Sequence, residues 1–131
     1  MIVLDTHAWV WFVDNPGRLS APARKAIEAA LAASSILISS ISSWEVAMLA
    51  ATGRLKLTID VRDWIAKCEA LPFFNFVPVD NAIFVRSVFQ PGPLHADPAD
   101  RIIIATALMK DIPIVTQDQR IRNYPGVQSI W

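Results

Sequence analysis

Short, continuously apolar runs alternate along this chain with longer stretches that have the apolar spacing of helices. The runs predict strands covered on both faces, at Ile2–Leu4, Ser35–Ser39, Phe74–Val77, Ile112–Thr116 and Val127–Trp131. The helical stretches lie at Thr6–Val13, Ala21–Ala33, Ser42–Thr52, Val61–Leu71, Asn81–Phe89 and Pro98–Met109. Strands separated by helices join through right-handed crossovers, so the pattern predicts an α/β fold with a mainly parallel sheet.

The length of 131 residues fits one ordinary domain, and no linker, internal repeat or low-complexity tract divides the chain. We therefore expect a single domain over residues 1–131. Hydrophobic residues make up 53% of the chain and charged residues only 18%. That apolar excess indicates either an unusually complete core or an apolar surface that is kept for a partner.

The net charge is zero, with 12 basic and 12 acidic residues. This balance argues against holding long nucleic acid by bulk charge, although a metal and a local patch would still serve a nuclease. Cys68 is the only cysteine, so an internal disulfide is impossible and a reducing, cytoplasmic setting is expected. The first residues lack the pattern of a signal peptide, and the apolar runs are far shorter than the ~20 residues of a membrane span.

Four carboxylates lie close to the switches between strand and helix, where parallel sheets bind their ligands. Asp5 ends the first strand, and Glu45 lies in the first turn of the helix after the second strand. Asp100 lies in the first turn of the last long helix, and Asp118 follows the strand that ends at Thr116. All four are therefore able to converge on one cleft.

Each of these acids also has a purely structural interpretation, which the sequence leaves open. Asp5 and Asp118 are suitable N-caps for the helices that follow them. Glu45 would complete a capping box with Ser42, and Asp100 suits the dipole of a helix N-terminus. Serine, threonine or asparagine would cap a helix equally well, however, so carboxylates at every switch are harder to explain by capping alone.

Carboxylates that converge in one cleft repel each other, and burying them unpaired is costly. A hard divalent cation cancels that cost, because magnesium binds oxygen ligands and keeps water molecules for phosphate groups. Such a metal is also able to activate a water for in-line attack and to stabilise the leaving oxygen. The acids therefore predict a phosphodiesterase site with one or two Mg²⁺ or Mn²⁺ ions.

At these residues the chain resembles the PIN-domain nucleases, and in particular the VapC-like toxins of bacterial toxin–antitoxin pairs. The opening IVLDTHAWVW is similar to the family's first strand and its Asp-Thr step. SSISSWEVAML resembles the segment with the family's glutamate, and DPADRIIIATAL followed by IPIVTQDQRI resembles the segments with its last two acids. The match runs from Met1 to about Ile121, and the order and context of four segments make it specific.

The resemblance implies a doubly wound parallel sheet flanked by helices and an endoribonuclease with Mg²⁺ or Mn²⁺ as cofactor. It assigns metal binding and catalysis to Asp5, Glu45, Asp100 and Asp118. Asp97 becomes a supporting candidate for the metal site, and Thr6 and Thr116 become candidates for orienting ligands or substrate. His95 precedes Asp97 in one branch of the family, but a lone loop histidine is more often incidental than a substrate contact. The implied partners are RNA, a cognate antitoxin protein and a second copy of the chain, with no membrane.

The aromatic residues of the first helix divide between two faces. Trp9, Phe12 and Val13 share one face, which core packing explains. Trp11 points away from Trp9, because residues two apart do not share a helix face, so Trp11 is the candidate for a partner surface such as an antitoxin groove. We expect exposed apolar surface on this helix. Nothing in the sequence indicates that these rings stack on RNA bases.

Three other functions fit parts of the pattern. A metal phosphohydrolase for small phosphate esters would use similar acids, but a haloacid-dehalogenase-like enzyme needs Asp-x-Asp where this chain has Asp5-Thr6-His7. A receiver-like signalling domain needs a lysine after a late strand, where this chain has Gln117 and Asp118. A PIN fold used only as a scaffold is the non-enzyme alternative, and the presence of all four acids argues against it.

Overall fold

A computed structural model describes residues 1–92 and 96–131, so His95 lies outside the described residues. The described residues form a five-stranded sheet in the order β3-β2-β1-β4-β5, and every pair of neighbouring strands is parallel. The strands are β1 (Ile2–Leu4), β2 (Ile36–Ser39), β3 (Phe74–Val77), β4 (Ile114–Val115) and β5 (Ser129–Ile130). The predicted doubly wound parallel sheet is therefore confirmed.

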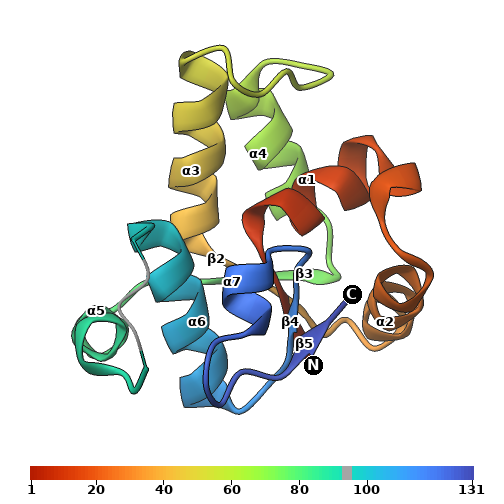
Figure 1. The fold of residues 1–131 in the computed structure, drawn as a ribbon. Helices are drawn as coiled ribbons and strands as arrows, with labels where there is room; N and C mark the ends of the chain where they lie inside the picture. The colour runs from red at the N-terminus through yellow and green to blue at the C-terminus, as the bar shows by residue number, and fades with distance from the viewer. Residues whose placement is uncertain (93–95) are drawn as a thin grey trace.

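Helices connect these strands and cover both faces of the sheet (Figure 1). They are α1 (Thr6–Asp14), α2 (Ala21–Ala32), α3 (Ser40–Ala51), α4 (Val61–Glu69), α5 (Asn81–Phe89), α6 (Pro98–Lys110) and α7 (Gln119–Arg122), with a short 3₁₀ helix η1 (Pro16–Arg18) after α1. Strand β4 is shorter than the predicted Ile112–Thr116, and Pro113 before it has no N–H to donate, although its carbonyl accepts from the N–H of Val3 at 3.0 Å.

Alternate side chains of β1 enter two separate cores. Leu4 points to the face that carries α1, α2 and α4, where it packs with Trp9 and Trp64. Val3 points to the opposite face and packs with Ile103 of α6. All five of these side chains are buried. Burial on both faces explains why the strands are continuously apolar in the sequence.

The central position of β1 creates the crevice that matters for function. The chain goes from β1 to β2 on one side and later returns to place β4 on the other, so the strand order reverses at β1. The backbone N–H of Asp5 donates to the carbonyl of Val115 at 3.1 Å, which holds the carboxyl ends of β1 and β4 side by side. Open parallel sheets bind ligands at such a switch point.

Two expectations about the helices are wrong. Helix α3 begins at Ser40 rather than Ser42, because the hydroxyl of Ser39 accepts from the N–H of Ile41 at 3.2 Å and caps the helix directly after β2. The expected exposed apolar surface on α1 lies instead on α3 and α5, since Trp9 is fully buried and Trp11 is half-buried. Among the described residues, no helix is both long and apolar enough to span a membrane.

Candidate functional site

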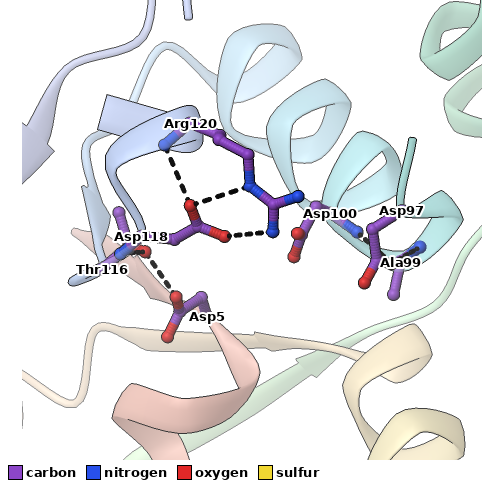
Figure 2. Close-up of polar contacts among 7 residues, drawn as sticks. All are labelled: Asp5, Asp97, Ala99, Asp100, Thr116, Asp118 and Arg120. Carbon is purple, nitrogen blue, oxygen red and sulfur yellow. Dashed lines mark hydrogen bonds and ion pairs between the residues drawn. The ribbon is translucent and has the colours of Figure 1, made fainter. Parts of the chain in front are cut away.

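A hollow of about 400 Å³ lies at the carboxyl ends of β1 and β4. We call it the acid hollow, and it is lined by Asp5, Thr6, His7, Trp11, Glu45, Asp97, Asp100, Gln117, Asp118 and Arg120. The structure thus brings all five sequence-predicted acids to one hollow, from four different parts of the chain. Figure 2 shows four of them, which come from the end of β1, the start of α6 and the start of α7.

Asp5 is held at the floor of the acid hollow by both of its carboxylate oxygens. One oxygen accepts from the backbone N–H of Ala8 at 2.8 Å and so caps α1. The other accepts from the hydroxyl of Thr116 at 2.5 Å (Figure 2). The same hydroxyl oxygen accepts from the backbone N–H of Asp118 at 3.0 Å. Buried Thr116 therefore fixes the acids that follow β1 and β4 relative to each other.

Two acids enter from the start of α6. The carboxylate of Asp97 caps this helix by accepting from the N–H of Ala99 at 2.8 Å and from that of Asp100 at 3.3 Å (Figure 2). Asp100 follows in the first turn, next to the helix N-terminus. A helix N-terminus carries partial positive charge, which favours carboxylates at this place.

Glu45 has a different environment from the one that the sequence suggested. Because α3 begins at Ser40, Glu45 lies in the second turn, and the predicted capping box with Ser42 is wrong. Ser42 is fully buried, and its hydroxyl oxygen accepts from the hydroxyl of Thr6 at 3.0 Å. This hydrogen bond joins α1 to α3, and in this way Thr6 stabilises the wall of the acid hollow. Glu45 lines that wall without serving as a cap.

Burial and mutual repulsion raise the pKa values of two acids in the hollow. The pKa of Asp5 is raised mainly by burial, although hydrogen bonds from Thr116 and Ala8 oppose the shift. The pKa of Asp100 is raised to about 8, first by burial and then by the negative charges of Asp97, Glu45, Asp118 and Asp5. The negative charges of the other four acids therefore disfavour ionisation of Asp100. The protein compensates the negative charge of the site only in part.

Arg120 is the residue of this site that the sequence interpretation missed. Its guanidinium donates to both oxygens of Asp118, with Nε–Oδ1 at 3.4 Å and Nη2–Oδ2 at 3.2 Å (Figure 2). The carboxylate of Asp118 holds the pKa of Arg120 above its usual value. The signal in the sequence was the spacing, because an arginine two residues after an N-cap aspartate is able to fold back onto it.

The donor set fits a hard divalent cation. Every candidate ligand is a carboxylate, which is the ligand type that Mg²⁺ and Mn²⁺ prefer. A cation would also stabilise the ionised form of Asp100, whose pKa is raised by burial and then by its acidic neighbours. Over the residues that the structure describes, no three histidine, cysteine or acidic side chains already form a ready-made ligand group.

Comparisons with known proteins agree with this fold. A protein-family model described as the PIN domain matches residues 2–127. Ribonuclease VapC22 of Mycobacterium tuberculosis is 33% identical to the chain over 132 aligned residues, which cover 99% of this chain and 98% of the relative.

Solved structures share the fold as well. In a toxin–antitoxin complex from Klebsiella pneumoniae, one chain is 23% identical, with a TM-score of 0.64 and coverage of 97% of this chain and 95% of that chain. In DNA-bound VapBC from Salmonella typhimurium, one chain is 18% identical, with a TM-score of 0.68 and coverage of 98% and 95%. At these identities the likeness concerns the fold alone.

The charge of Asp100 predicts how the metal-free protein responds to pH. The pKa of Asp100 is about 8 in the folded chain, above the ordinary value of 3.8. Between these two pH values the folded state binds more protons than the unfolded state, so the free energy of unfolding falls as pH rises. Asp100→Asn removes the charge, so its stability relative to wild type should increase from pH 5 to pH 8. Thermal unfolding in EDTA measures this difference.

The matched control is Asp63→Asn, which removes an exposed acid of α4 outside the acid hollow. Its stability relative to wild type should stay constant over the same pH range. A constant difference between Asp100→Asn and wild type would contradict the electrostatic account of the site.

Proposed function

Because the chain belongs to the PIN-domain family, we propose that it is a metal-dependent endoribonuclease and the toxin of a toxin–antitoxin pair. One observation carries the proposal: five acids line one hollow at the switch point of the sheet, where burial and then the charges of the other four raise the pKa of Asp100. We propose that the single domain over residues 1–131 acts in the cytoplasm, in keeping with its lone, buried Cys68.

We assign metal binding to Asp5, Glu45, Asp100 and Asp118, with Asp97 in support. These residues would hold a Mg²⁺ or Mn²⁺ ion, which when bound would supply activation of a water and stabilisation of negative charge on the leaving oxygen. The protein's own contribution is to fix the ligands. Thr116 orients Asp5 through its hydroxyl and Asp118 through its accepted hydrogen bond.

Arg120 has two roles in this proposal. In the structure it pairs with Asp118 and offsets part of the negative charge of the acid hollow. A metal held by Asp118 would compete with that ion pair and would leave the guanidinium of Arg120 inside the hollow. A free guanidinium there suits an RNA phosphate, because its planar donors match phosphate oxygens. A local cation of this kind allows a chain of zero net charge to hold RNA.

A second hollow gives the proposed antitoxin a place to bind. We call it the α3 groove, of about 370 Å³, and it is lined by His7, Trp44, Glu45, Met48, Leu49, Arg54, Leu55, Asp97 and Pro98. Trp44 and Met48 are 53% and 40% exposed, which suits the apolar face of an amphipathic peptide. The groove shares Glu45 and Asp97 with the acid hollow, so a Lys or Arg of that peptide would reach the acids.

Helix α5 offers the face for a second copy of the chain. Phe84, Val85, Val88 and Phe89 on this helix are 47%, 59%, 54% and 81% exposed. Helix α5 packs on α6 at the outer edge of the molecule (Figure 1). Exposed apolar groups of this size usually belong to an interface. We propose a homodimer through α5, which leaves the α1 and α3 walls of the acid hollow open.

Cleavage of RNA by the purified protein tests the activity. The protein should cut single RNA chains internally with Mn²⁺ or Mg²⁺ and lose this activity in EDTA. Glu45→Gln should lower the rate at least ~100-fold, because it removes a charged ligand without removing a helix cap. The products are measured by gel electrophoresis and by sequencing of their 5′ ends.

The control is Glu69→Gln, an exposed glutamate of α4 outside the acid hollow, which should cleave as wild type does. Turnover of small phosphate esters without RNA cleavage would support the phosphohydrolase alternative. A wild-type protein that cleaves neither substrate with any divalent metal would support the scaffold alternative.

Trp44→Ala tests the proposed antitoxin groove. The substitution removes an exposed apolar contact, so it should weaken binding of an amphipathic, arginine-containing peptide about 10-fold or more. Fluorescence anisotropy of a labelled peptide from the cognate antitoxin measures the affinity. Unchanged peptide affinity in this variant would locate the antitoxin elsewhere.

Phe89→Ser tests the proposed dimer. The ring is the most exposed of the α5 face, so a serine there should shift the protein from dimer towards monomer in sedimentation at micromolar concentration. Met109→Ser, a change at an exposed residue of α6, should leave the assembly unchanged. A wild-type protein that sediments as a monomer at this concentration would refute the dimer.

A further inference from the structure

Planar side chains from α1 continue the wall of the acid hollow away from the carboxylates. His7 and Trp11 lie one helical turn apart and both line the hollow. Their ring centroids are 5.7 Å apart, with the planes tilted by 51°. His7 is exposed and Trp11 is half-buried, so part of this aromatic wall faces solvent beside the acids.

Two further groups hold the Trp11 ring in place. The ring centroid of Trp131 lies 5.8 Å from that of Trp11. The Cζ atom of Arg18 lies 4.6 Å from the Trp11 centroid, in a cation–π contact. Arg18 is exposed, so it places a positive charge on the same surface. The result is an aromatic wall that lines the same hollow as the acids, with the Arg18 cation over the Trp11 ring.

The proposed chemistry uses the phosphate of the substrate and leaves its bases without a binding site. Aromatic rings stack on unpaired bases, and this interaction requires no net charge on the protein, which suits a chain with zero net charge. Bases inside a duplex are already stacked on both sides, so only a single-stranded segment or a loop is able to use such a wall.

We propose that His7 and Trp11 form a base-binding subsite for single-stranded RNA. An unpaired base beside the cleaved phosphate stacks on the His7–Trp11 wall, and Arg18 contacts a neighbouring phosphate. This inference rests on the proposed ribonuclease function and adds the side chains that hold a base next to the cleaved phosphate. Trp11 thus belongs to the RNA site, whereas Trp44 belongs to the α3 groove.

The test measures RNA binding in the full-length Asp100→Asn protein with Mn²⁺, because this variant should bind RNA without cutting it. The probe is a single-stranded RNA with 2-aminopurine at one position, varied along a series, since stacking on an indole quenches its fluorescence. Trp11→Ala should abolish quenching at the position that contacts the wall and weaken RNA affinity roughly 5- to 100-fold. Affinity for the same RNA in a duplex should be low in both proteins.

Matched variants separate stacking from folding and from peptide binding. Trp11→Phe keeps an aromatic ring and should retain most of the RNA affinity, while His7→Ala changes only an exposed ring and should weaken binding by a smaller factor. Trp44→Ala in the same background should retain the quenching signal and the RNA affinity. Circular dichroism and thermal melting establish that each variant is folded.

Three results would overturn the subsite. They are an unchanged RNA affinity and quenching signal in folded Trp11→Ala, equal affinity for duplex and single strand, and a loss of antitoxin-peptide binding in Trp11→Ala with RNA binding intact. If wild type cleaves RNA but Trp11→Ala binds it normally, the subsite fails and the proposed function stands. If wild type cleaves no RNA, the proposed function itself fails.

Discussion

Repulsion among carboxylates at the switch point of the sheet is the constraint on which the rest of this site depends. The fold reduces its cost by making three of these acids caps, since Asp5, Asp97 and Asp118 accept backbone N–H groups at the starts of α1, α6 and α7. The same acids therefore cap helices and line the acid hollow, so the capping role and the proposed metal-binding role are compatible. A carboxylate has several acceptor sites, so it is able to cap a helix and still face the hollow. Burial of Asp100 and the remaining negative charge together raise the pKa of its carboxyl, and a cation in the hollow would offset both effects.

The sequence predicted the parts of the molecule that follow from local patterns. Apolar runs predicted the parallel sheet. The sequence also predicted that Asp5, Asp100 and Asp118 lie close together, because each follows a strand or begins a helix. The predicted start of α3 was wrong because Ser39 and Ser42 are both suitable N-caps. Only tertiary contact decides between them, since Ser42 is buried and accepts a hydrogen bond from Thr6. Arg120 was missed because its spacing from Asp118 permits the ion pair without requiring it, and the side-chain conformation in the folded protein decides whether it forms.

Two adjacent hollows give the proposed toxin a simple route to inhibition. The acid hollow and the α3 groove share His7, Glu45 and Asp97, so a peptide seated in the groove lies beside the acids. Such a peptide would carry the positive charge that this neutral chain lacks. The tryptophans divide accordingly: Trp9 and Trp64 build the core, Trp11 faces the acids, and Trp44 faces the groove. The burial of each tryptophan distinguishes these roles, and the number of tryptophans in the sequence does not.

The most direct test of the central claim, that the acid cluster holds a divalent cation, is the number of protons released when Mn²⁺ binds. At pH 7 a carboxyl with a pKa of about 8 is mostly protonated, so Asp100 must lose its proton to become a ligand. Titration calorimetry in two buffers of different ionisation enthalpy gives this number. The account predicts about one proton per bound ion in wild type, and far less in any residual binding by Asp100→Asn. Saturable Mn²⁺ binding without proton release, or no binding to wild type at all, would contradict it.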